Sequence, residues 1–301
     1  MGGADPQKPE LRAASIRGAM RFWFRAMAGA VTDDPREVYK LESEVFGNTE
    51  KKSKVVVRVI RQFQIKEFSK CFERKLVNYI GYGLYGMSGH PDKKSLINEA
   101  KFEIKYPYPE FKFPIAYSLW FIQNIGGFGA RSRKGFGSVS IVSDDTETNA
   151  ILKLPVAKVL NKTNIASHIR KALNLKEDNL DFVQQSEIPS LSPHLFNFVI
   201  INTHFFNEKL LLYEINKTYR TLRRTKLTKQ ERKYLGFSKN GRRSSPLFIR
   251  PVKPQGQDTF SLVLFLFKTK FHRDYPDPNF SQLWKEIIKT FENLGKRYPY
   301  A

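Results

Sequence analysis

The segment SIRGAMRFWFRAM, residues Ser15–Met27, predicts an amphipathic helix near the start of the chain. Its bulky apolar side chains recur at three- and four-residue spacing, which places them on one helix face; they are Ile16, Met20, Trp23 and Met27. Ser15 can cap the first turn. A second stripe on this helix is cationic and consists of Arg17, Arg21 and Arg25. These arginines either face phosphates or pair with acids of the protein such as Glu42 and Glu44.

Helices and strands are expected to alternate through the rest of the first half. Asp34 and Pro35 start a second helix, and Gly47 ends it. The helical spacing of its apolar residues predicts that Val38, Leu41 and Val45 face inward. The other expected elements are strands at residues 54–65, 102–106 and 138–142 and a buried helix at 113–123.

The second half repeats this order loosely. Its expected elements are strands at 196–202, 246–252 and 259–268 and helices at about 208–224 and 280–295. A βαββαβ unit, the ferredoxin-like or RRM-like arrangement, is the simplest pattern covering both halves. The acidic stretch at 144–150 suggests a boundary. We therefore expect an α+β protein with two ferredoxin-like domains packed side by side, residues 1–145 and 146–301. The first lacks its opening strand and the second its closing one.

Positive charge is the main feature of the composition. The 301 residues include 51 Lys and Arg against 29 Asp and Glu, a formal net charge of +22. Such an excess repels itself in the folded state, so an anionic partner is expected. Nucleic acid is the usual partner of a basic domain; a membrane surface and an acidic protein are the alternatives.

Several classes of protein are disfavoured by what the sequence lacks. The apolar runs are short, and we find neither a secretory signal nor a lipidation motif. The single cysteine, Cys71, excludes an internal disulfide and a cysteine-based zinc site. We expect a cytoplasmic protein.

The most basic stretch is 217–243, with eleven Lys or Arg and one acid, Glu231. Lys217, Arg220 and Arg224 project together from the expected helix, opposite its apolar face. A solvated surface normally interleaves acids with bases. Because this stretch does not, we favour contact with phosphates over a merely solvated face.

The segment GGFGARSRKGFG, residues 126–137, forms an expected glycine-rich loop. Gly127 and Gly129 let backbone N–H groups approach an anion, and Arg131, Arg133 and Lys134 add cationic donors. The spacing matches neither a dinucleotide fingerprint nor a P-loop. The loop suits recognition of a nucleic-acid backbone; the alternative is a flexible turn that its basic residues keep in solution.

Catalytic patterns are weak. The five histidines form no metal-spaced pair, and we expect neither a metal nor a cofactor. His90, close to Asp92, could act as a general acid or base, although a solvated loop histidine is the simpler interpretation. Asp144 and Asp145 could bind a divalent ion or serve only as linker polarity.

Four segments resemble one CRISPR protein family: residues 10–25, 41–47, 126–137 and 242–247, the last containing Arg242 and Arg243. The glycine-rich loop resembles the one shared across the RAMP superfamily of CRISPR type III systems. Together the four segments are similar to the first-numbered RAMP subunit of the Cmr (type III-B) effector complex. Members usually carry a strand before residues 2–6, which here begin the chain. A truncated start or a strand supplied from elsewhere would account for the difference.

The resemblance implies a non-catalytic RNA-binding subunit in antiviral defence. Such a subunit assembles with other Cmr proteins around guide and target RNA, near the 3′ region of the guide, while cleavage is attributed to the repeated backbone subunit. One alternative is a metal-independent RAMP endoribonuclease that uses His90 to trim guide precursors; another is a protein-docking scaffold. The expected RNA-contacting residues are Arg17, Arg21, Arg25, Gly127, Gly129, Arg131, Arg133, Lys134, Lys217, Arg220, Arg224, Arg242 and Arg243.

Overall fold

The computed structural model describes residues 9–66, 74–81, 95–176, 180–236, 244–254, 256–270 and 277–296. Before its second sheet the chain forms the helices α1 (Ala13–Ala28), α2 (Pro35–Phe46), α4 (Arg74–Val77), η1 (Pro109–Phe111), α5 (Lys112–Asn124), α6 (Thr146–Leu152), α7 (Val156–Val159) and α8 (Ile165–Leu173). The last three of these helices follow residue 145 but pack into the core of the first half. The strands of the first half are β1 (Val56–Lys66) and β2 (Ser95–Lys105). The second half contains β3 (Phe196–Asn202), α9 (Glu208–Thr221), η2 (Leu222–Lys226), α10 (Lys229–Tyr234), β4 (Leu247–Val252), β5 (Ser261–Phe267) and α11 (Phe280–Lys296).

Helices α1 and α2 form where the sequence patterns place them. All four residues of the apolar stripe on α1 are buried. The capping residue expected for α1 is wrong, because Arg12 occupies the N-cap and offers no side-chain hydrogen bond. Asp34 does cap α2, accepting from the backbone N–H of Arg36, and Gly47 ends it with φ of 72°. Leu41, expected to face inward, is 38% exposed.

The first half contains a two-stranded antiparallel sheet of β1 and β2. The strand expected at 138–142 is wrong, because these residues join no ladder. Side chains bind their backbone instead. The N–H of Ile141 donates to Oε1 of Gln123 at 2.7 Å. The carbonyl of Val139 accepts from the guanidinium of Arg250 at 2.9 Å.

The second half contains a three-stranded antiparallel sheet in the order β3-β5-β4. Strands β3 and β4 are joined through α9, and β5 lies between them, which is the split βαβ arrangement. The strands and helices expected in this half are confirmed, apart from shifts of one or two residues at their ends and a change of helix type after Thr221.

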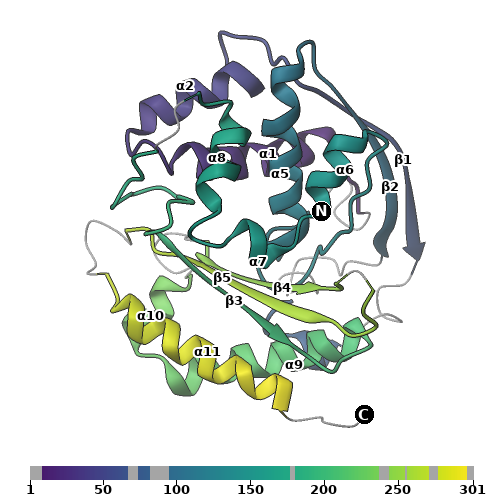
Figure 1. The fold of residues 1–301 in the computed structure, drawn as a ribbon. Coiled ribbons are helices and arrows are strands. Elements are labelled where there is room, and N and C mark those ends of the chain that lie inside the picture. The colour runs from purple at the N-terminus through teal and green to yellow at the C-terminus, as the bar shows by residue number, and fades with distance from the viewer. Residues whose placement is uncertain are drawn as a thin grey trace.

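Strand β5 is buried on both faces, because helices cover both sides of the sheet (Figure 1). Val263, Phe265 and Phe267 point into the core shared with α1 and α5. Leu262, Leu264 and Leu266 alternate with them and point into a second core with α9 and α11. The helices of the first half therefore rest on one face of the second-half sheet, and α9 and α11 lie on the other (Figure 1).

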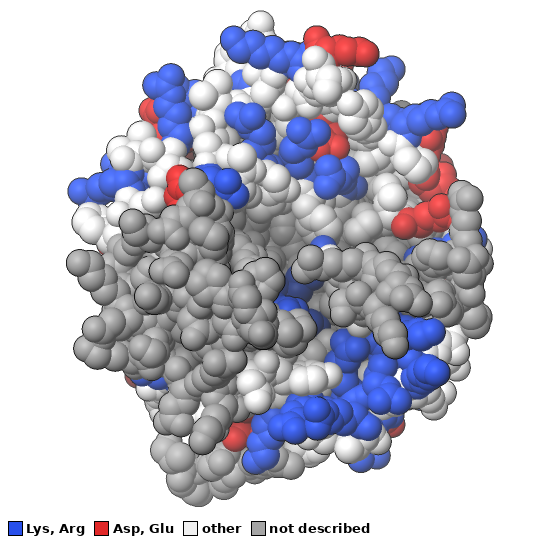
Figure 2. All heavy atoms as spheres, turned by 180° about the vertical axis from the view of Figure 1, so that it is seen from behind, with Lys and Arg blue, Asp and Glu red and all other residues white. Residues whose placement is uncertain are grey.

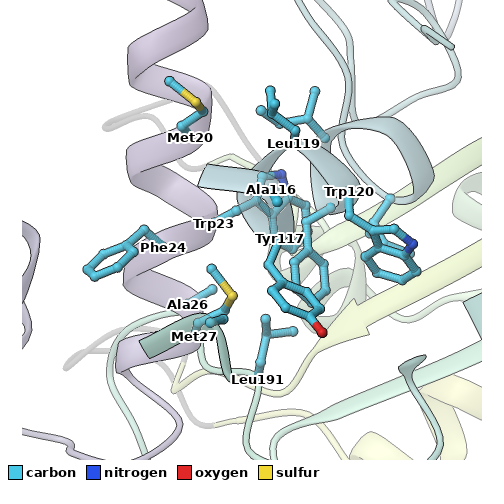
Figure 3. Packing of buried hydrophobic residues seen from close by; sticks show 14 of the residues in the cluster. Met20, Trp23, Phe24, Ala26, Met27, Ala116, Tyr117, Leu119, Trp120 and Leu191 are labelled. Atoms are coloured by element: carbon cyan, nitrogen blue, oxygen red, sulfur yellow. The ribbon is translucent and has the colours of Figure 1, made fainter. Parts of the chain in front are cut away.

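The core of the first half is centred on the contact between α1 and α5. Figure 3 shows Trp23 and Met20 of α1 facing Ala116 and Leu119 of α5. The Trp23 indole stacks on the Phe121 ring with centroids 5.0 Å apart, and it also contacts aromatic side chains of β4 and β5. This aromatic cluster joins the two halves.

Helices α6, α7 and α8 were not expected from the sequence. Their buried side chains, among them Ile151, Val159 and Ile169, belong to the first core. Asp145 caps α6 by accepting from the N–H of Thr148, and it forms an ion pair with Lys112. Of the two aspartates at 144–145, Asp145 is therefore a helix cap. A domain division at this point stays a prediction.

Candidate RNA interface

The structure separates the expected RNA-contacting residues into three groups with different surroundings. One group lies on α1, one in the glycine-rich loop and one on α9. A fourth pair, Arg242 and Arg243, lies outside the described residues, as does His90.

The arginines of α1 contact groups of the protein itself. The guanidinium groups of Arg21 and Arg25 both pair with the Glu42 carboxylate, the second at 2.9 Å. Glu42 is 1% exposed, so its charge is removed from water and compensated by these two cations. Nη2 of Arg17 lies 3.4 Å from the carbonyl oxygen of Val55. Two of the three arginines on this stripe are therefore engaged by one shared carboxylate, which neutralises one of the three positive charges.

The glycines of the loop allow it to close on itself. Gly127, Gly129 and Gly137 have φ of 136°, 88° and 67°. The N–H of Phe128 donates to the carbonyl of Gly137 at 3.0 Å. A Cβ on Gly137 would lie 1.9 Å from the carbonyl oxygen of Phe128, so only glycine fits there. At Gly127 and Gly137 the glycines serve a close backbone crossing within the protein.

Two cations of this loop are inserted between the halves of the molecule. Nζ of Lys134, which is 8% exposed, lies 2.9 Å from Oγ of Ser245, 3.3 Å from the carbonyl of Leu247 and 4.2 Å from the ring centre of Tyr219. Burial lowers the pKa of Lys134 well below its ordinary value, and Arg223, Arg133 and Arg131 add to the effect.

Arg133 makes equivalent contacts next to Lys134. Its guanidinium lies 5.1 Å from the Phe22 ring centre and 4.7 Å from that of Phe248, and it donates to the Ser245 carbonyl at 2.5 Å. Burial lowers the pKa of Arg133 to about 10. The backbone of the loop also adds to the edge of β4, where Ile249 N–H donates to the Arg133 carbonyl. Arg131, with φ of 64°, is half-buried.

The α9 residues are the expected group that is both exposed and gathered in one place. Lys217, Arg220 and Arg224 are exposed, and all three line a groove of about 500 Å³. Within the residues that the structure describes, no ion pair joins them to a carboxylate. We call this feature the α9 groove; its walls are Leu76, Tyr213, Glu214, Asn216, Lys217, Arg220, Thr221, Arg224 and Thr225.

The floor of the α9 groove is held by a hydrogen-bonded side chain. The amide oxygen of Asn216 accepts from the N–H groups of Tyr79 and Ile80, at 2.9 and 3.0 Å. This contact ties residues 74–81 to α9 and brings the exposed Leu76 to the groove wall. Leu76 and Tyr213 supply apolar surface beside the cations. A groove of this kind can hold phosphates and stack or cover bases.

Figure 2 shows the molecule from behind relative to Figure 1, and the distribution of charge on this face agrees with the placement of exposed cations on α9. Figure 2 shows Lys and Arg gathered in the lower half, the half that contains α9 and α11, with little Asp or Glu among them. In the upper half Lys and Arg alternate with acidic side chains (Figure 2).

Sequence reasoning missed two basic residues that support the fold. Arg250 of β4 is 2% exposed and bonds the carbonyls of Gln123 and Val139, and burial lowers its pKa to about 9. Arg223 of η2 donates to the carbonyls of Arg232 and Gly236. The sequence could have indicated the role of Arg250, because a single cation inside an apolar strand is expected to bind buried carbonyl groups.

The comparisons with known proteins identify the family. The CRISPR system Cmr subunit Cmr1-1 of Pyrococcus furiosus is 30% identical over 285 residues, covering 88% of this chain and 82% of that protein. The chain belongs to the Cmr1 family. Residues 1–140 match the family model of the RAMP superfamily. Cmr1-2 of the same organism is 33% identical over 164 residues, covering 47% of this chain and 88% of that protein.

Solved structures confirm the Cmr1 fold. The apo crystal structure of Cmr1 from Pyrococcus furiosus superposes with a TM-score of 0.65 at 24% identity, covering 93% of this chain and 89% of that one. A chain from a cryo-EM structure of a type III-B Cmr-β complex bound to cognate target RNA gives a TM-score of 0.56 at 14% identity, covering 93% of each chain. Both likenesses describe an α+β fold with small antiparallel sheets.

The described residues offer neither a metal centre nor a membrane-spanning helix. They contain no cluster of three or more His, Cys, Asp or Glu side chains that could hold a metal ion. Helices long and apolar enough to cross a membrane are likewise absent from this part of the chain.

Proposed function

We propose that this Cmr1-family chain is a non-catalytic RNA-binding subunit of a type III-B Cmr effector complex in the cytoplasm. It contacts guide or target RNA near the 3′ region of the guide and assembles with other Cmr proteins in antiviral defence. Membership of the Cmr1 family supports the assembly, as does the fold shared with a chain of a target-bound Cmr complex.

The α9 groove is the RNA-contacting surface in this proposal. The observation that carries it is that Lys217, Arg220 and Arg224 converge on one groove without carboxylate partners among the described residues. The two other groups have less charge to offer. Arg21 and Arg25 of α1 share the Glu42 carboxylate, and Arg133 and Lys134 are enclosed between the halves.

The fold of the second half supports the ferredoxin-like architecture. The order β3-β5-β4 with α9 crossing from β3 to β4 corresponds to the first three strands of such a unit. We extend this architecture to both halves, with the division between them at the acidic stretch near residue 145. Helix α9 then presents its apolar side to the sheet and its cationic side to RNA.

A binding titration with single-stranded RNA tests the proposal. Changing Lys217, Arg220 and Arg224 together to Ala should weaken binding at least roughly tenfold and reduce the slope of log affinity against log salt by about 2. The matched control changes Lys153, Lys158 and Lys162 to Ala. These exposed lysines belong to or flank α7, which lies on the opposite side of the second-half sheet from α9 (Figure 1). Equal affinity of the two triple variants would contradict the proposal.

The non-catalytic part of the proposal has a separate test. The purified protein is incubated with labelled guide-precursor RNA in EDTA, and we expect the RNA to remain intact. Metal-independent cleavage that His90→Ala abolishes would establish the nuclease alternative instead.

A further inference from the structure

A smaller pocket lies on the other side of α9, between α9 and α11. Its volume is about 230 Å³, below the roughly 300–1,000 Å³ of typical small-molecule sites. We call it the α9–α11 pocket. Its lining consists of Lys217, Thr218, Thr221, Lys226, Glu286, Lys289, Thr290, Asn293 and Leu294.

The chemistry of this lining favours an anion. Three lysines, Lys217, Lys226 and Lys289, face one carboxylate, that of Glu286. Across the described residues, none of these lysines forms an ion pair with an acid. Asn293 adds an amide that can donate to an oxygen. Lysines act as point charges on rotatable stems, which suits a phosphate group without demanding one bidentate geometry.

The pocket and the α9 groove share part of their walls. Lys217 and Thr221 line both of them. The π-helical turn η2 follows Thr221 and directs Arg224 to the groove and Lys226 to the pocket. Helices α9 and α11 both pack on the same core, which fixes the pocket against the sheet. A phosphate chain leaving the groove at Lys217 therefore meets a second set of cations without crossing an uncharged surface.

We propose that the α9–α11 pocket is a second subsite for the RNA strand bound in the α9 groove, and that it holds one phosphate and its sugar. This inference rests on the proposed function, because the groove must hold RNA for the pocket to extend it. The volume admits a single backbone unit rather than a stacked base pair. The strand is then bent around α9, with its bases over Leu76 and Tyr213 and its backbone turning past Lys217.

Oligonucleotide length separates the pocket from the groove. We would compare labelled oligouridines of about 4 and about 16 nucleotides, each ending in a 3′-hydroxyl or a 3′-phosphate. The pocket variant is Lys226→Ala with Lys289→Ala, the groove variant is Arg220→Ala with Arg224→Ala, and the control is Lys158→Ala with Lys162→Ala. Thermal unfolding of each variant checks that it is folded.

The pocket variant should lose roughly tenfold in affinity for the long RNA and about 0.7 in the slope of log affinity against log salt, the value for one lost phosphate contact, with little change for the short RNA. If the pocket variant loses more affinity for the oligonucleotides with a 3′-phosphate than for those with a 3′-hydroxyl, the pocket binds a terminal phosphate monoester. If it loses the same affinity for both, the pocket binds an internal phosphodiester. If the groove variant weakens binding while the pocket variant matches the control at both lengths, the subsite is refuted and the proposed function stands. If neither variant differs from the control, the proposed function fails as well.

Discussion

The ammonium nitrogen of Lys134 lies 2.9 Å from the hydroxyl oxygen of Ser245, a residue 111 positions later in the chain. This contact and the neighbouring one from Arg133 to the Ser245 carbonyl connect the glycine-rich loop to the segment directly before β4. Buried cations are costly unless carbonyls, hydroxyls or aromatic faces surround them, and all three are present here. We infer that these two cations hold the halves of the protein together, leaving RNA contact to α9.

Arg133→Ala should reduce the stability of the protein and leave RNA binding unchanged, whereas Arg224→Ala should weaken RNA binding and leave stability unchanged. Arg133→Ala removes the hydrogen bond to Ser245 and the guanidinium between two phenylalanine rings, so the free energy of unfolding should fall by about 1–3 kcal/mol. Arg224 is exposed, and Arg224→Ala should change stability by less than about 0.5 kcal/mol. Urea unfolding measures both values.

RNA titrations complete this comparison. We expect the folded Arg133→Ala protein to bind single-stranded RNA as the parent does, and Arg224→Ala to bind more weakly. Weaker RNA binding by a fully folded Arg133→Ala protein would show that the loop contacts RNA directly.

Gly137→Ala should destabilise the glycine-rich loop. The residue has φ of 67°, and its Cβ would collide with the backbone oxygen of Phe128. We expect a loss of at least about 2 kcal/mol in the free energy of unfolding. Gly18→Ala in α1 is the matched control, because a Cβ there meets nothing within 4 Å and alanine favours the helix by about 0.5–1 kcal/mol. If Gly137→Ala left the free energy of unfolding unchanged, the close approach of the Gly137 backbone to Phe128 would be contradicted.

Glu42→Gln tests whether the α1 arginines are committed to a structural pair. The substitution keeps the size of the side chain and removes the charge that compensates Arg21 and Arg25. Because the arginines are partly exposed, stability should fall by only about 1–3 kcal/mol, with RNA affinity unchanged within about twofold. The exposed Glu44, paired with Lys51, provides the control, and Glu44→Gln should cost under about 1 kcal/mol. A large change in RNA affinity for Glu42→Gln would indicate that the arginines of α1 contact RNA.

The stability of the protein should depend on pH through His168. Burial lowers the pKa of this histidine below its ordinary value of 6.5, with Lys158 and Lys171 adding to the effect. Its Nδ1 lies 2.9 Å from the Tyr117 hydroxyl, whose pKa burial raises to about 12. The unfolded chain therefore binds a proton near pH 6.5 that the folded protein resists, and stability is lost as the pH falls through that value.

Urea unfolding between about pH 8 and about pH 5 measures this contribution. The free energy of unfolding should decrease more steeply in the parent than in His168→Gln, whose side chain does not titrate. Parallel pH profiles for the two proteins would show that His168 takes up its proton equally in both states.

Sequence patterns predicted the parts of the fold that depend on local periodicity. The apolar stripe of α1, the cap at Asp34 and the strands of the second sheet follow from spacing and turn chemistry within a few residues. Helices α6 to α8 are short, and their hydrophobic residues become informative only against α5, so they were missed. The strand expected at 138–142 did not form, because the side chains of Gln123 and Arg250, 18 and 111 residues away, bind its backbone groups.

The candidate site was predictable only where charge alone decides it. On α9 the cationic face lies opposite the apolar face, and local spacing is enough to place Lys217, Arg220 and Arg224 together. Arg133 and Lys134 have the same composition signal, yet their burial depends on Phe22, Tyr219 and Phe248 in distant segments. Sequence also placed Glu42 only as one of several acids that could pair with α1.

Photo-crosslinking of RNA to this chain within an assembled Cmr complex, followed by mass spectrometry of the linked peptides, tests the RNA-contacting surface most directly. The predicted result is linkage to residues 208–226, including Tyr213 in the α9 groove, and none to residues 131–136. Crosslinks concentrated at residues 131–136, with α9 unlinked, would contradict the assignment of RNA binding to α9.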